Sequence, residues 1–164
     1  MSQPDQSPIE WVAGLLREAF PAAEVIEVVP RTGGQLSAVY EVRCVDSAHT
    51  AIFKVYAPEW AWKQAKEVRV YEMLAGLRTL PVPSVLHHTP PGAGPGGRAV
   101  TILSLLEGRP LSEVSTDLDP AAVPAFYREM GAALATVHQI GQESYGYLTD
   151  RNLDPLADPA SPRT

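Results

Sequence analysis

The first half of the chain carries three short runs rich in β-branched and aromatic residues, at 25–29, 37–44 and 51–56. Runs of this length and composition are typical of strands. Because only short turn-like segments separate them, we expect three consecutive antiparallel strands. Two further candidate strands, 82–88 and 99–105, are separated by a stretch so rich in proline and glycine that it predicts a surface loop.

Three other segments, 9–20, 59–77 and 120–140, have apolar residues at helical spacing. Proline marks each beginning: Pro8 stands at the first helical position of the first, and Pro58 and Pro120 open the other two. The pattern predicts an α+β fold. It consists of a five-stranded antiparallel sheet with a long helix on it, preceded by an N-terminal helix and followed by one further helix.

Composition excludes several classes of protein. Hydrophobic residues make up 45% of the 164 positions and the net charge is −6, which argues against nucleic acid as a partner. The chain has no run of 18 apolar residues and no apolar N-terminal signal segment, so we expect no membrane contact and a cytoplasmic location. The four histidines show no metal-ligand spacing, and Asp117 and Asp119 precede a helix that they are suited to cap. We therefore assign no metal ligand.

The most informative residue is Lys54, which lies in the apolar run 51–56. A lysine on a buried strand costs several kcal/mol unless an anion meets it. One alternative is an edge strand on which the lysine stem packs while the ammonium reaches water. Glu67 favours a paired lysine, because its helical spacing from Tyr71 and Leu74 turns it toward the core.

Two weaker signals accompany the lysine. Glu67 could instead form a surface pair with Lys63, one turn earlier on the same helix. Gly33 and Gly34 lie between the first two predicted strands, where glycine lets backbone N–H groups approach a phosphate. A glycine hairpin turn without any ligand is the alternative. Glycine turn, strand lysine and helix glutamate in this order suggest half of a nucleotide-phosphate clamp.

Several segments, in this order, resemble the N-terminal lobe of the aminoglycoside phosphotransferase family, relatives of choline kinase with a protein-kinase-like fold. The matching segments are 34–40, 52–54, 66–74, 102–111, 131–138 and 145–148. The resemblance divides the chain into a flexible leader (1–8), a kinase-like N-lobe (9–105), a hinge with the first helix of an incomplete second lobe (106–148), and an irregular tail (149–164).

The resemblance implies ATP as the bound nucleotide. Lys54 would contact its phosphates and Glu67 would orient Lys54. The remaining implied binding residues are Gly33, Gly34 and Ser37 over the phosphates and the backbone near Ser104 and Leu106 for adenine. The reaction implied is transfer of the γ-phosphoryl group to a small-molecule hydroxyl, with Mg²⁺ expected in the complete family member.

The chain departs from the family after His138, because no His-x-Asp-x-x-x-x-Asn pattern and no following magnesium-binding aspartate occur there. We therefore assign no catalytic residue and no metal ligand. The sequence is expected to represent a nucleotide-binding lobe that needs a C-lobe to engage its acceptor. The alternative is a non-catalytic nucleotide-binding or interaction module, an inactive truncated remnant of a kinase.

The last predicted helix, 121–140, carries an apolar stripe formed by Val123, Phe126, Met130, Leu134 and Val137. A stripe of this kind is unfavourable in water. We expect it to fold back on the sheet, to self-associate, or to meet a C-terminal partner.

Overall fold

The computed structural model describes residues 8–31, 37–77 and 80–141. Its centre is a five-stranded sheet in the order β1-β2-β3-β5-β4, and each neighbouring pair is antiparallel. The strands are β1 (Val25–Arg31), β2 (Ser37–Cys44), β3 (Ala51–Tyr56), β4 (Val85–Thr89) and β5 (Val100–Ser104). The predicted α+β fold with a five-stranded antiparallel sheet is confirmed.

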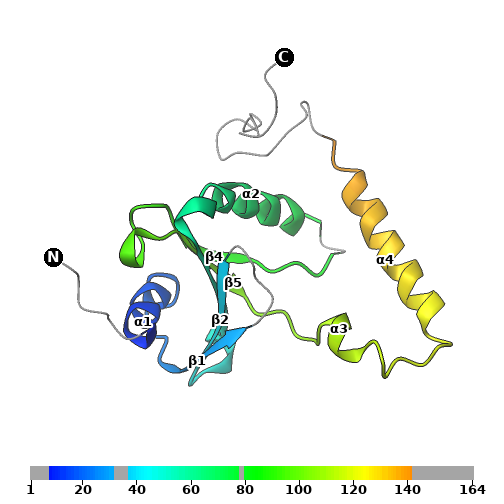
Figure 1. Ribbon diagram of the computed structural model, residues 1–164, viewed down its shortest axis with the longest axis horizontal. Coiled ribbons are helices and arrows are strands. Elements are labelled where there is room, and N and C mark those ends of the chain that lie inside the picture. The colour runs from blue at the N-terminus through cyan, green and yellow to red at the C-terminus, as the bar shows by residue number, and fades with distance from the viewer. Residues whose placement is uncertain (1–7, 32–36, 78–79, 142–164) are drawn as a thin grey trace, which may run out of the picture.

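Helix α1 (Pro8–Ala19) covers one face of the sheet and encloses the main core (Figure 1). Trp11 of this helix meets the rings of Tyr40 and Phe53 edge-on, at 6.4 Å between ring centroids in both cases. The apolar residues buried in this core are Val12, Leu16, Ala23, Val42, Cys44, Ala51, Phe53, Val55, Val100 and Ile102. Strand alternation places every second residue of the central strands on this side.

Helix α2 (Lys63–Ala75) covers the other face, and contacts β4 and β5 (Figure 1). The predicted helix 59–77 differs at its start, where the structure has a separate 3-10 turn, Pro58–Trp60. In this turn the Trp60 amide donates to the carbonyl of Ala57, three residues earlier. Such tight turns are frequent at the beginning of α-helices.

The strand predicted at 82–88 begins three residues later in the structure, at Val85 of β4. Pro81 and Pro83 lack an amide hydrogen and cannot donate to a strand ladder. Between β4 and β5 the predicted surface loop contains only a 3-10 turn, Pro95–Gly97.

After β5 the chain passes through a short helix, α3 (Leu111–Val114), which the sequence does not predict, and then enters α4 (Val123–His138). The Ala121 amide donates to the Asp119 carboxylate at 2.9 Å, so Asp119 stabilises the turn before α4. It does not cap the helix as expected, because the N-cap residue is Ala122 and no described side chain bonds to the first turn. Helix α4 contains no buried residue and lies apart from the sheet (Figure 1). Of the three expected outcomes for its apolar stripe, folding back on the sheet is therefore not what the structure shows.

The leader up to residue 7 and the tail 149–164 lie outside the described residues. Within the ranges that the structure describes, no helix is long and apolar enough to cross a membrane.

We predict that Leu16→Ala lowers the free energy of unfolding by about 2–5 kcal/mol, because Leu16 is fully buried between α1 and the sheet. Chemical denaturation followed by circular dichroism measures the change. Arg17→Ala on the exposed side of α1 is the control, expected to stay within about 0.5 kcal/mol of the parent. A loss for Leu16→Ala no larger than that of the control would show that α1 is not part of the core.

Candidate functional site

Lys54 and Glu67 form an ion pair between β3 and α2. Alternation along β3 turns Phe53 and Val55 toward the α1 side and Lys54 toward the α2 side. The Lys54 side chain is 23% exposed and the Glu67 side chain 25%. The predicted pairing of these two residues is thus present, and both charged groups remain partly accessible to solvent. The alternative pairing of Glu67 with Lys63 is not the one observed, because the Lys63 ammonium lies 4.5 Å from the ring centroid of Trp60.

Tyr56 is a third member of this site. Its hydroxyl donates a hydrogen bond of 2.7 Å to Glu67 Oε2, the same carboxylate oxygen that receives the Lys54 ammonium. The Lys54 ammonium also lies 5.3 Å from the Tyr56 ring centroid. Two donors on β3, Lys54 and Tyr56, therefore hold the Glu67 carboxylate in place. The sequence offers one signal for this role, because Tyr56 follows Lys54 by two positions and shares its face.

Burial raises the pKa of the Tyr56 hydroxyl well above its ordinary value of 10.0, and the hydrogen bond to the Glu67 carboxylate raises it further. Burial also raises the pKa of Tyr71, again with a contribution from the charge of Glu67. Both phenols therefore keep their protons at neutral pH, and Tyr56 acts as a donor to the carboxylate. The ammonium of Lys54 supplies the compensating positive charge in this environment.

Gln64 anchors α2 so that Glu67 faces the lysine. Its side-chain amide is buried and donates to the carbonyl oxygens of Thr89 and Val100, at 3.0 and 2.7 Å. Glu67 follows Gln64 by three residues, so both lie on the side of α2 that faces the sheet. The sequence reasoning missed Gln64, because a glutamine at this spacing is equally typical of an exposed helix position.

The segment after β5 contains backbone groups that bond to no other described residue. Ser104 ends β5, and its amide donates to the carbonyl of Ser84 at 2.9 Å while its hydroxyl accepts from the Ser84 amide at the same distance. Leu106 is 46% exposed, and its backbone makes no hydrogen bond to any other residue in the described part of the chain. Of the two positions expected to hold adenine, Leu106 is the one with an available N–H and C=O.

The remaining predicted site residues are Gly33, Gly34 and Ser37. Gly33 and Gly34 belong to segment 32–36 and lie outside the described residues. Ser37 is the first residue of β2 and pairs with Tyr56 in the sheet register. Across residues 8–31, 37–77 and 80–141, no three side chains of the metal-binding types gather where they could hold a metal ion.

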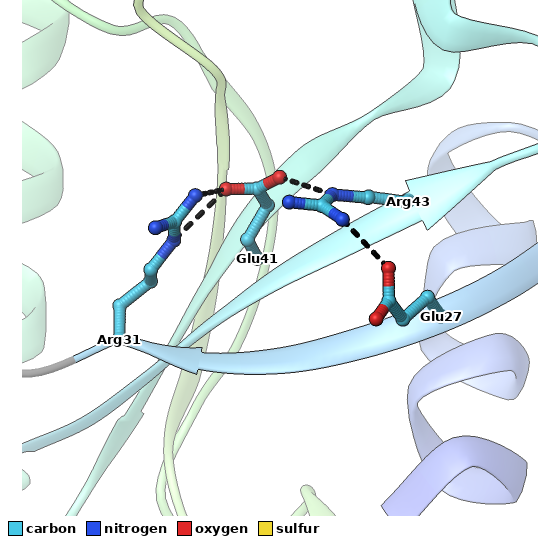
Figure 2. A network of polar contacts seen from close by, with 4 residues as sticks. All are labelled: Glu27, Arg31, Glu41 and Arg43. Carbon is cyan, nitrogen blue, oxygen red and sulfur yellow. Dashed lines mark hydrogen bonds and ion pairs between the residues drawn. The ribbon is translucent and has the colours of Figure 1, made fainter. Parts of the chain in front are cut away.

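A second charged cluster, which the sequence analysis did not identify, consists of Glu27, Arg31, Glu41 and Arg43 (Figure 2). Strand alternation places Glu41 on the same sheet face as Val39, which pairs with Lys54. Glu41 is 5% exposed and accepts from Arg31 Nε at 2.9 Å and from Arg43 Nε at 2.6 Å. Arg43 continues to Glu27, with 2.7 Å between Nη1 and the carboxylate. The hydrogen bonds from Arg31 and then Arg43 lower the pKa of Glu41, so this carboxylate stays ionised despite its burial.

We predict that the free energy of unfolding falls above about pH 10, because the buried Tyr56 keeps its proton in the folded state and releases it on unfolding. One such tyrosine contributes a slope of up to ~1.4 kcal/mol per pH unit. Tyr56→Phe removes this contribution and should give a flatter profile between pH 10 and about 11.5, measured by urea unfolding.

Tyr127→Phe, at an exposed position of α4, is the matched control for this substitution. Equal slopes for the parent and Tyr56→Phe would contradict the buried, protonated tyrosine.

Comparison with known proteins bears on the fold and on the family of the chain. Among solved structures, the chain is similar to one named "Putative fructosamine-3-kinase" from Haemophilus somnus 129PT, with a TM-score of 0.59 and 17% sequence identity. The alignment covers 92% of this chain and 45% of that one, so the present chain spans less than half of its structural relative. No curated protein sequence matches the chain.

The expected kinase-like fold is confirmed by this structural similarity. The sequence model described as "Phosphotransferase enzyme family" matches residues 27–163. This range includes the sheet except the first two residues of β1, and it includes the Lys54–Glu67 pair and α4. The chain therefore belongs to the phosphotransferase enzyme family.

Proposed function

We propose that this chain forms the ATP-binding part of a phosphotransferase that moves the γ-phosphoryl group of ATP to a small-molecule hydroxyl. The observation that carries the proposal is the Lys54–Glu67 pair, held by Tyr56 and left partly exposed on one face of the sheet. A cation fixed in this way is suited to bind an anionic phosphate without losing further side-chain freedom. Family membership supports the same reaction class.

In this proposal each site residue has a defined role. Lys54 orients the phosphates, and Glu67 orients Lys54. Segment 32–36 with Gly33 and Gly34, together with Ser37, covers the phosphates through backbone N–H groups. Leu106, with Ser104 beside it, holds the adenine edge through backbone groups.

The described residues carry the binding function and no chemical step. Phosphoryl transfer also needs a group that positions the acceptor hydroxyl and a metal ion that neutralises the developing charge. Among the described residues no three side chains of the metal-binding types lie together, and we assign neither the Mg²⁺ carboxylates nor the acceptor site to this chain. We propose that both belong to a C-lobe that completes the site, and that the protein works in the cytoplasm.

A non-catalytic nucleotide-binding module is the second candidate function. It is favoured by the sequence after His138, which carries no His-x-Asp-x-x-x-x-Asn pattern. A turnover assay with the purified chain and a panel of hydroxyl acceptors separates the two candidates. ATP-dependent product formation would exclude the non-catalytic module for this chain.

We predict that Lys54→Ala weakens binding of a non-hydrolysable ATP analogue at least about tenfold, because a charge-assisted hydrogen bond is worth about 1.5–3 kcal/mol. Isothermal titration calorimetry measures the affinity, and circular dichroism checks that the fold is intact. Lys63→Ala is the control, since that ammonium lies against Trp60 rather than Glu67. Unchanged analogue binding by Lys54→Ala would dismiss the proposed clamp.

We further propose that the chain self-associates through the apolar stripe of α4. Met130 and Leu134 on this stripe are 49% and 54% exposed, and α4 contains no buried residue. Exposed apolar patches of this kind mark interaction surfaces in soluble proteins.

Size-exclusion chromatography with light scattering is expected to show a species larger than a monomer. The double variant Met130→Glu with Leu134→Glu should convert it to a monomer, because charge in an apolar contact is unfavourable. Ala125→Glu with Ala132→Glu places the same charge on the opposite side of α4 and serves as the control. A clean parent monomer that binds no hydrophobic dye would contradict self-association.

A further inference from the structure

The sheet register places the Glu41 cluster beside the Lys54 site. Arg31, Val39 and Lys54 lie opposite one another in one row across β1, β2 and β3, and this row continues to Thr101 in β5. The adjacent row on the same face consists of Val29, Glu41, Ile52 and Leu103. The two rows are two residues apart along each strand, which is a separation of about 7 Å.

This register determines what the Glu41 row faces when a nucleotide is bound. Along β5, Leu103 of the Glu41 row lies between Thr101 of the lysine row and the segment that leads to Leu106. In the proposed function, phosphates lie at Lys54 and the adenine edge at Leu106. The nucleoside that connects these two ends must therefore cross the row that contains Glu41.

Burial of the charged Glu41 side chain costs free energy that a purely structural role does not explain. Its carboxylate is almost fully buried, and a buried ion pair is often no more stabilising than apolar residues of the same size. The carboxylate receives Arg31 on one oxygen and Arg43 on the other, and Glu27 holds Arg43 in turn. Figure 2 shows the two guanidinium groups directed at Glu41 from opposite sides.

Arg31 has one guanidinium nitrogen that donates to no other described residue. Its Nε and Nη2 donate to Glu41, while Nη1 donates to no residue in the described part of the chain. The side chain is 51% exposed, and Arg31 is the last residue of β1 before segment 32–36. A guanidinium whose orientation is fixed by a carboxylate offers a flat face for stacking and free N–H groups at its edge.

We propose that Arg31, held in place by Glu41, forms one wall of the nucleotide site and binds the nucleoside portion of ATP. The planar guanidinium lies against the base and ribose, and its free N–H groups bond to ribose oxygens. Glu41 acts as a positioning residue, and Arg43 with Glu27 keeps the Glu41 carboxylate in place. This inference rests on the proposed function and adds a determinant of affinity that Lys54 does not supply.

The test compares two ligands, a non-hydrolysable ATP analogue and adenosine, by isothermal titration calorimetry. Arg31→Met is expected to weaken the binding of both ligands by a similar factor, about fivefold. Lys54→Ala is expected to weaken only the analogue, because adenosine has no phosphate. Arg17→Met, on α1 and hence on the opposite face of the sheet, removes the same charge and should leave both affinities unchanged.

Three outcomes would overturn the inference. Loss of analogue binding without loss of adenosine binding would mean that Arg31 acts on the phosphates. Arg31→Met could leave the affinity for both ligands unchanged while Lys54→Ala weakens analogue binding as expected. This result would reject Arg31 as a wall of the nucleotide site and leave the proposed function intact. Failure of the unsubstituted chain to bind either ligand would instead reject the proposed function itself, and the inference with it.

Two further variants test how Arg31 acts. Arg31→Lys keeps the charge but loses the planar group, and it should bind adenosine as weakly as Arg31→Met. Glu41→Gln should weaken adenosine binding in the parent chain and have little further effect in the Arg31→Met background. Full binding by Arg31→Lys, or an independent loss from Glu41→Gln in that background, would contradict the positioning role. Thermal unfolding of each variant confirms that the comparison concerns folded protein.

Discussion

A lysine on an interior strand of a sheet is stable only when an anion meets its charge, and this requirement organises the site. Lys54 lies on β3 between two other strands, and removing its ammonium from water without a partner would cost several kcal/mol. Glu67 supplies the anion and Tyr56 fixes it. Helix α2 must therefore lie on this face at a defined position, and the buried amide of Gln64 holds it there through the carbonyl oxygens of Thr89 in β4 and Val100 in β5.

The two faces of the sheet have different roles. Helix α1 and the apolar residues beneath it supply the core, with Phe53 fully buried at its centre. The opposite face carries charge, in the form of the Lys54–Glu67 pair between β3 and α2 and of the Glu41 cluster. An apolar core on one side allows the strands to carry buried polar groups on the other, because β alternation keeps the two sets apart. The charged face is the one that we propose for ATP.

Strand composition and helical spacing predicted all five strands, α1, α2 and α4, because the sequences of these elements carry regular apolar patterns. Irregular features were less accessible to prediction. The 3-10 turn at Pro58–Trp60 and the short α3 depend on local backbone geometry that has no period, and the late start of β4 follows from prolines whose effect is local. The Lys54–Glu67 pair was predictable because each residue breaks an apolar pattern. The Glu41 cluster was not, because alternating charges on a strand are equally typical of a solvated face, and only the register brings Arg31 and Arg43 onto one carboxylate.

The central claim is that Glu67 serves nucleotide binding by holding Lys54. A double-mutant cycle of Lys54→Met and Glu67→Gln, read as affinity for a non-hydrolysable ATP analogue, tests it most directly. If Glu67 acts through the lysine, the double variant binds no more weakly than Lys54→Met alone, so the two losses do not add. Additive losses, or full affinity in both single variants, would contradict the account.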